Sequence, residues 1–350
     1  MRIAALALVL GLARFTYSQQ YSAVDIRQVV SDSFRATALA EDGSLGGYII
    51  TGTSSQRRAA TFLGGVLSTY SGLGGEFSRG LDLTPNGRLI GLSYTNFDDP
   101  TGVFWDESGN ASRLPLLNGG SYAYAIWGTV DSQMAGFADT IDNRQELYLT
   151  DGETAVGVGW PTEDYFVEIV DFAGGLFIGN LYNWGEGGRA GAFIYDVASR
   201  ESRLITDQNI ELNDVNDRGQ IVGWRSRFLG DPFHGFLIEG SDETILGSEF
   251  YPRQLNNMDL ILGSSINDSR PGLFRNGAWA SADELSFGTA LSVETLTRVN
   301  DQGQIQGRAS SGSYVTQVLL TPVPEPSAFV AFGLGVALLT WKRKGKVVSL

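Results

Sequence analysis

The sequence contains one histidine and no cysteine, so few side chains could act as a base or a nucleophile. A serine hydrolase would need His234 beside a reactive serine and a carboxylate, yet no Gly-x-Ser-x-Gly turn occurs. We therefore interpret His234 as a surface-loop residue. The lack of cysteine excludes disulfides, thiolate metal sites and cysteine nucleophiles. A single histidine likewise excludes a metal site built from several imidazoles.

Carboxylates offer a second kind of chemistry, because glycoside hydrolysis uses two of them across one sugar bond. The chain has 39 Asp and Glu residues, and the pairs adjacent in sequence include Asp98-Asp99, Glu163-Asp164 and Asp242-Glu243. Adjacency in sequence does not bring two carboxylates together in a cleft. Solvated turns are therefore the favoured interpretation of these pairs.

Oxygen-rich turns are a third possibility, because Ca²⁺ binds carboxylate and carbonyl oxygens. Asn-Asp pairs recur at 213–214, 216–217 and 300–301, but neither EF-hand spacing nor a Gly-Gly-x-Gly-x-Asp array is present. Asn and Asp are also common turn residues. The glycine-rich segment 185–188 lacks the helix and lysine of a phosphate-binding loop. The sequence thus predicts neither a metal ion nor a cofactor.

Aromatic residues are plentiful and could stack on the faces of sugar rings. Packing in the core of the fold is the more frequent use of such side chains. The residues that leave this choice open are Tyr122, Tyr124, Trp127, Trp160, Tyr165, Trp184 and Trp224.

Composition favours a β protein with many turns: the 350 residues include 45 glycines, 43% hydrophobic residues and only 18% charged residues. The formal net charge is -14, and six of the 25 basic residues lie in the two terminal segments, so the body is more acidic still. An acidic surface repels nucleic acid and anionic lipid. We therefore expect no nucleic-acid partner.

One phrase recurs along the chain: an apolar residue, Asn or Asp, a turn, an apolar pair and a closing glycine. Its clearest copies are 215–223 and 299–307, and weaker copies are 83–91 and 255–263. Successive closing glycines lie 40 to 45 residues apart, at Gly47, Gly91, Gly136, Gly179, Gly223, Gly263 and Gly307. Each copy reads as strand, turn and strand, and a second pair of apolar stretches follows. The sequence thus contains seven repeats of about 44 residues with four strands each.

Repeats of this size predict an all-β fold, a seven-bladed β-propeller over residues 19–321. The last repeat runs out of chain near Leu320, and a spare strand at 22–30 could complete it and close the ring. A β-solenoid and two packed sandwiches are the alternatives. The repeats also resemble the HAF-type extracellular repeat through Ala192-Phe193-Ile194-Tyr195 and Gly235-Phe236-Leu237-Ile238. That resemblance implies an exported protein.

The N-terminus has the pattern of a secretory signal peptide. Arg2 is followed by an apolar run from Ile3 to Ala13, and small residues stand at Thr16 and Ser18. We expect residues 1–18 to form a signal helix that is cleaved after Ser18.

The C-terminal residues 322–350 form a separate segment. The Pro-rich stretch 321–327 is not expected to continue a sheet. An uncharged apolar run follows from Ala328 to Trp341, and a predicted helix over it would be about 21 Å long, short of the ~30 Å hydrocarbon core. A basic end completes the segment and would stay on the cytoplasmic side; it comprises Lys342, Arg343, Lys344 and Lys346.

This tail resembles the PEP-CTERM sorting signal in composition, order and position. The motif residues are Val323, Pro324, Glu325, Pro326 and Ser327. The resemblance implies recognition by exosortase in the membrane, cleavage near the motif, and release to the cell envelope or extracellular matrix. The tail covers about 29 residues, so it indicates the destination of the body and not its task.

For the body we expect a non-catalytic structural or binding propeller that contacts matrix glycan or another surface protein. The alternative is a secreted propeller enzyme, a lyase or glycoside hydrolase that acts on polysaccharide. Three or more Asp, Glu, Arg or His side chains converging at one end of the channel would favour the enzyme. An exposed aromatic or polar patch suffices for a binding protein.

Overall fold

A computed structural model describes residues 20–26, 33–52, 56–75, 77–94, 100–128, 133–142, 144–184, 188–226, 233–248, 250–284, 291–312 and 314–323. The expected signal helix, the apolar run and the basic end of the tail lie outside these residues, as do Pro324 to Ser327. Within the described part of the chain, no helix is long and apolar enough to cross a membrane.

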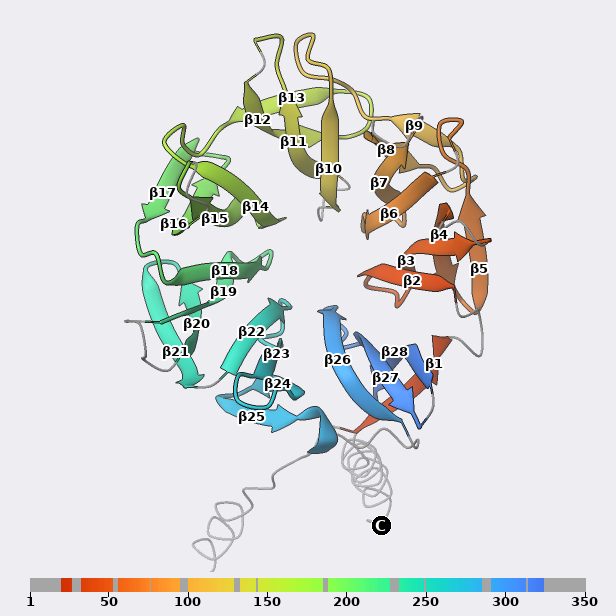
Figure 1. Ribbon diagram of the computed structural model, residues 1–350, viewed down its shortest axis with the longest axis vertical. Helices are drawn as coiled ribbons and strands as arrows, with labels where there is room; N and C mark the ends of the chain where they lie inside the picture. The colour runs from red at the N-terminus through yellow and green to blue at the C-terminus, as the bar shows by residue number, and fades with distance from the viewer. Residues whose placement is uncertain are drawn as a thin grey trace, which may run out of the picture.

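The described residues form seven four-stranded antiparallel sheets arranged as blades around a central axis (Figure 1). The predicted seven-bladed β-propeller is thereby confirmed. The first strand of each blade is nearest the axis, and we call it the inner strand. Blades 1 to 3 comprise β2 (Phe34–Leu39), β3 (Leu45–Thr51), β4 (Gln56–Leu63), β5 (Val66–Tyr70); β6 (Phe77–Leu83), β7 (Leu89–Tyr94), β8 (Pro100–Trp105), β9 (Ala111–Arg113); and β10 (Ala123–Gly128), β11 (Met134–Asp139), β12 (Gln145–Thr150), β13 (Ala155–Gly159).

The remaining blades follow the same order along the chain. Blades 4 and 5 comprise β14 (Phe166–Ala173), β15 (Leu176–Tyr182), β16 (Arg189–Asp196), β17 (Glu201–Ile205); and β18 (Ile210–Val215), β19 (Gln220–Arg225), β20 (His234–Glu239), β21 (Asp242–Ser248). Blades 6 and 7 comprise β22 (Phe250–Leu255), β23 (Ile261–Ser265), β24 (Pro271–Arg275), β25 (Ala278–Ser281), with the short 3-10 helix η1 (Ala282–Glu284); and β26 (Ser292–Val299), β27 (Ile305–Ser311), β28 (Tyr314–Pro322), β1 (Tyr21–Asp25).

The seven closing glycines all lie in the second strand of a blade, opposite a β-bulge in the inner strand. Gly136, for example, pairs with Ala125, and the bulge follows at Ile126. An added Cβ at Gly136 would stand well under 3.0 Å from the carbonyl oxygen of Tyr124. Corresponding backbone contacts with the inner strand occur at the other six glycines. The glycine of the repeat is therefore needed because the bulged backbone approaches too closely for any side chain.

Apolar side chains fill the space between neighbouring blades. Trp127 of β10 packs edge-on against Phe177 of β15, and both belong to one buried cluster with Phe172 and Phe193. Burial of such rings from two sheets joins each blade to the next. The core is thus distributed around the ring and does not lie on its axis.

The ring closes through its two ends, as the sequence predicted. β1 pairs antiparallel with β28 and supplies the fourth strand of blade 7, with Ser22 opposite Thr321. Tyr21 is only 3% exposed, so the closing strand is part of the core. The strand covers Tyr21–Asp25, whereas the sequence predicted a strand at 22–30. Residues 27–30 lie outside the described part of the chain.

The Pro-rich stretch begins inside the sheet, which corrects the expectation that it could not continue one. β28 extends to Pro322, opposite Tyr21. The pairing of β27 with β28 ends at Leu320, so Pro322 has no partner on the β27 side. Proline is tolerated there because no hydrogen bond of the ladder is lost. The N–H group of Val323 then donates a hydrogen bond to the carbonyl of Gln20 at 2.8 Å. The first residue of the sorting motif is thereby held beside the closing strand.

Candidate functional site

The bulges place one residue of each inner strand in the central channel. Together they line a cavity of about 570 Å³, and they are Thr37, Leu81, Ile126, Val170, Asn213, Arg253 and Thr297. Some of these side chains also join blades. Thr37 donates to the carbonyl of Gly80 at 2.9 Å, and Asn213 donates to that of Pro252 at 2.6 Å.

Carboxylates occupy the position after the bulge in three blades. Asp82 accepts a hydrogen bond from the N–H of Gly128 at 2.9 Å, so it links blade 2 to blade 3. Asp171 and Asp214 accept the N–H groups of Val215 and Leu255 in the same way. Each carboxylate therefore holds the backbone of the next blade.

Burial raises the pKa of two of these carboxyls, Asp82 and Asp214. Desolvation raises the pKa of Asp82 to about 6, although the charge of Arg298 opposes the shift. Desolvation also raises the pKa of Asp214 well above its usual value, and the neighbouring Asp171 raises it further. A pair of buried carboxyls in close contact favours sharing one proton over carrying two charges.

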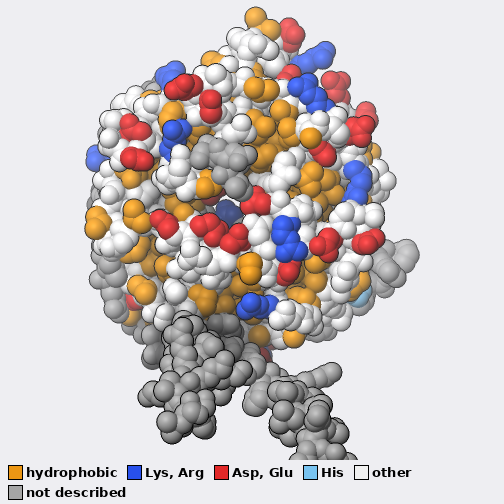
Figure 2. Space-filling view, turned by 180° about the vertical axis from the view of Figure 1, so that it is seen from behind, with side chains coloured by type: hydrophobic (Ala, Val, Ile, Leu, Met, Phe, Trp, Pro, Cys, Tyr) orange, Lys and Arg blue, Asp and Glu red, His pale blue; other side chains and the backbone are white. Residues whose placement is uncertain are grey.

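One end of the channel is acidic. The turns that follow β2, β18 and β26 contribute Glu41, Asp217 and Asp301, and we call this opening the acidic mouth. Figure 2 shows acidic side chains around the opening on this face of the ring, with a basic side chain deeper inside. The convergence that would favour an enzyme is therefore present. Burial raises the pKa of Glu41 even though the N–H of Asp301 donates to it.

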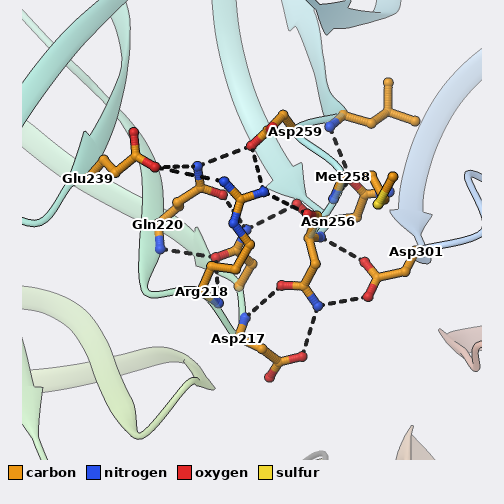
Figure 3. A network of polar contacts seen from close by, with 11 residues as sticks. Asp217, Arg218, Gln220, Glu239, Asn256, Met258, Asp259 and Asp301 are labelled. Atoms are coloured by element: carbon orange, nitrogen blue, oxygen red, sulfur yellow. Dashed lines mark hydrogen bonds and ion pairs between the residues drawn. The ribbon is translucent and has the colours of Figure 1, made fainter.

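The turns at this mouth are tied together across blades. Asn216, Asn256 and Asn300 each accept backbone N–H groups of their own turn through Oδ1. Their Nδ2 groups donate to the carbonyls of Asn256, Asn300 and Ala40, in the next blade round the ring. Figure 3 shows the blade 5 and blade 6 part of this network, where Arg218 also pairs with Asp259 at 3.2 Å. The recurrent Asn-Asp turns thus have a structural role.

The calcium hypothesis for these turns gains no support. Among the described residues, no group of three or more Asp, Glu or His side chains is arranged to hold a metal ion. Asn257 instead donates from its Nδ2 to Asp217 at 3.0 Å and to Asp301 at 2.7 Å, so an amide stands between the two carboxylates.

A second hollow, which we call the aromatic groove, lies between blades 3 and 4. Its volume is about 720 Å³, and its lining includes Phe137, Trp160, Phe166, Tyr182 and Trp184. Phe166 is 52% exposed and Trp184 is 65% exposed, although both are large apolar rings. Their ring centroids lie 6.0 Å apart at 82°. Exposed rings that line a groove offer apolar surface to a ligand.

Polar groups stand along the same groove. The hydroxyl of Tyr182 donates to Glu168 at 2.7 Å, and Gln145 donates from Nε2 to the hydroxyl of Tyr122 at 3.0 Å. Tyr122 and Tyr124 pack on each other and on Phe137. A few polar groups beside apolar rings are typical of sites that bind small ligands.

The structure separates the aromatic residues that the sequence left open. Trp127 is buried, and Trp160 and Tyr165 pack against the same cluster. Trp224 lies between Phe233 and Tyr251. Trp184, Tyr122 and Tyr124 belong to the groove or its edge, whose existence the sequence could not indicate because it joins two blades.

The other candidates within the described part of the chain lie at separate places. His234 is the first residue of β20, opposite Arg225 and Ser248, so its assignment to a surface loop was wrong. Pairing with β19 on one side and β21 on the other places it in the sheet. Glu163 and Asp164 lie exposed before β14, and Glu243 of β21 pairs with Arg225. Asp98 and Asp99 lie outside the described residues.

Comparison with protein families assigns the tail. Residues 322–344 match the PEP-CTERM protein-sorting motif. The tail is therefore a sorting signal of the type that exosortase recognises, which implies export with transit through the membrane. The match leaves the body unassigned, and no curated protein is detectably similar to the chain.

Solved structures share the fold of the body. An oligogalacturonate lyase in complex with manganese is 13% identical, with a TM-score of 0.56 over 87% of this chain and 91% of the other. The β-propeller domain of the Trilobed protease from Pyrococcus furiosus is 6% identical, with a TM-score of 0.55 over 87% and 94%. A Mycobacterium tuberculosis puromycin-hydrolyzing peptidase is 11% identical, with a TM-score of 0.56 over 88% and 55%. Identities this low define the propeller fold alone.

Proposed function

We propose that the body is a non-catalytic binding propeller that holds a glycan of the envelope or matrix in the aromatic groove. The observation that carries this proposal is the pair of exposed rings, Phe166 and Trp184, at a groove of about 720 Å³. Exposed rings are unfavourable in water unless a partner covers them. Sugar rings are suitable partners, because their C–H faces stack on aromatic faces while their hydroxyls reach the adjacent polar groups.

The tail supports the destination in this proposal. A sorting motif at 322–344 implies that exosortase handles the chain during export. The resemblance of the repeats to HAF-type extracellular repeats also favours export. Cleavage near the motif would release a propeller whose ends are already joined by β1 and β28. The released body would then reach the cell envelope or the extracellular matrix, where polysaccharide is available.

Loss of either exposed ring is expected to weaken glycan binding by about tenfold, since a stacked ring contributes about 1 to 2 kcal/mol. The test is calorimetric titration of the wild type, Phe166→Ala and Trp184→Ala with oligosaccharides found on a glycan array. Val66→Ala is the control, because Val66 is 63% exposed on the outer strand of blade 1. Equal affinities for all four proteins would refute the aromatic groove as the site. Release of reducing ends from the same glycans would refute the non-catalytic role.

The enzyme alternative rests on the buried carboxyls of the channel. Desolvation raises the pKa of Asp214, and the neighbouring Asp171 raises it further. A protonated carboxyl could act as a general acid. Both side chains already accept backbone N–H groups of the next blade, however, and this use favours a structural role. A polysaccharide lyase or hydrolase activity that disappears in Asp214→Asn would favour the enzyme.

Replacement of Pro324, Glu325 and Pro326 by alanine is expected to block processing in the native host. The unprocessed chain should then remain in the membrane fraction with its full mass. Immunoblots of fractionated cells and mass spectrometry of the released body measure this outcome. Val347→Ala with Val348→Ala is the control, because these residues follow the matched range of the motif. Normal release of the alanine variant would contradict the sorting role.

A further inference from the structure

Three arginines in the central channel form no ion pair with any described carboxylate, although the chain carries a net charge of -14. Arg79, Arg253 and Arg308 line the same cavity of about 570 Å³. Arg79 lies in the first half of β6, and Arg308 pairs with Thr295 in the first half of β26. Arg79 and Arg308 therefore stand nearer the mouth at which the inner strands begin, opposite the acidic mouth, whereas Arg253 occupies the bulge position of β22. We call the opening nearer Arg79 and Arg308 the basic mouth.

Aromatic rings lie beside two of these cations. The guanidinium of Arg79 lies 5.4 Å from the ring centroid of Tyr48, and that of Arg253 lies 5.3 Å from the ring of Tyr251. Nε of Arg79 is buried without a hydrogen-bond partner. Arg298 differs, because its Nε donates to the carbonyl of Thr37 at 3.1 Å. The fold thus satisfies one arginine of the channel internally and leaves three with donors available to a ligand.

A buried acceptor beside these arginines also lacks a partner. Gln306 is only 4% exposed and lines the same cavity. Its Nε2 donates to the carbonyl of Ala36 at 3.0 Å, whereas its Oε1 has no partner in the structure. An unsatisfied buried acceptor is unfavourable. A ligand hydroxyl would satisfy it, so the cavity offers donors for an anion and an acceptor for a hydroxyl.

A chain of side chains connects the basic mouth to the aromatic groove. Arg189 lies 6.0 Å from the ring centroid of Tyr182, which lines the groove, and it pairs with Glu211. Tyr251, which lines the channel cavity, donates from its hydroxyl to Glu211 at 2.9 Å. Side-chain contacts therefore run from the lining of the aromatic groove to the lining of the channel cavity.

We propose that the basic mouth binds the oxyanion of an acidic sugar, a uronate carboxylate or a sulfate ester, within the oligosaccharide that the aromatic groove holds. This inference rests on the proposed glycan binding and specifies its ligand class. Planar guanidinium groups bind such oxyanions through paired N–H donors. A cavity of about 570 Å³ has the size of a small-ligand site. The acidic mouth repels anions, so the ligand enters from the opposite side.

The test compares three trisaccharides of matched linkage by calorimetric titration: one with uronates, one with sulfate esters and one neutral. We expect an acidic trisaccharide to bind the body at least tenfold more tightly than the neutral one, with a preference that falls as NaCl is raised. The triple variant Arg79→Gln, Arg253→Gln and Arg308→Gln should lose that preference and keep the neutral affinity. The difference between the uronate and sulfate arms identifies the oxyanion.

The matched control is Arg58→Gln, Arg113→Gln and Arg200→Gln, which removes the same charge from exposed positions. This control should keep the preference, and circular dichroism should show both triple variants folded. Equal affinity for neutral and acidic sugars, or an unchanged preference in the channel variant, would overturn the inference while leaving glycan binding intact. Tighter binding of an acidic peptide than of any sugar would also overturn it. Failure of every sugar to bind would instead reject the proposed function itself.

Discussion

Gly136→Ala is expected to destabilise the propeller by about 3 kcal/mol or more, a large part of the stability of an ordinary domain. An added Cβ would stand well under 3.0 Å from the carbonyl oxygen of Tyr124 and 2.8 Å from the Cα atom of Ala125 in the inner strand. These are backbone atoms, so no rotamer change relieves the overlap, and β10 and β11 must separate. Urea denaturation followed by tryptophan fluorescence would measure the loss as a lower midpoint.

Gly188→Ala is the matched control for this prediction. The nearest atom to an added Cβ at Gly188 is Nδ2 of Asn183 at 3.9 Å, and its backbone φ is not in the left-handed region. The control should therefore unfold within about 0.5 kcal/mol of the wild type. If Gly136→Ala were equally stable, the close approach of the inner strand would not be the reason for the repeated glycine.

The ring was predictable because its repeated contact uses a residue type that the sequence displays. The bulge of each inner strand excludes a side chain opposite, so glycine returns at Gly47 and in every later blade. The Asn of the clearest repeats recurs for a second reason. Asn216 and Asn300 each accept a backbone N–H of their own turn and donate a hydrogen bond to a carbonyl of the next blade. Both constraints act within about ten residues of the glycine, and a local pattern can record them.

The channel was not predictable, because corresponding positions in the seven blades differ in residue type. The position after the bulge holds Ala38, Asp82, Trp127, Asp171, Asp214, Gln254 and Arg298 in blades 1 to 7. Only the bulged register aligns these residues with one another. The sequence therefore indicated neither the acidic carboxyls, the arginines of the basic mouth nor the aromatic groove. The sequence also placed His234 in a loop, whereas this residue begins β20. Membership of that strand depends on the assembled sheet, which a local pattern does not record.

Joining the closing strand covalently is expected to stabilise the body strongly. The double variant Ser22→Cys and Thr321→Cys places two thiols on residues that pair directly across β1 and β28. Paired positions in an antiparallel ladder have Cα atoms about 4.5 to 5.5 Å apart, within the range that a disulfide spans. Ser22 is exposed, so an oxidant can reach it. The chain has no cysteine of its own, and no other thiol competes.

The size of this effect reports whether unfolding requires the ring to open. A disulfide that closes a loop of nearly the whole body restricts the unfolded chain by up to about 5 kcal/mol. The thermal midpoint of the oxidised variant should then exceed that of the reduced variant by about 10 °C. Each single-cysteine variant is a control for the loss of the side chain, including the hydrogen bond from Ser22 to the carbonyl of Thr321. Equal midpoints for the oxidised and reduced double variant would mean that the blades separate elsewhere, and that β1 does not hold the ring closed.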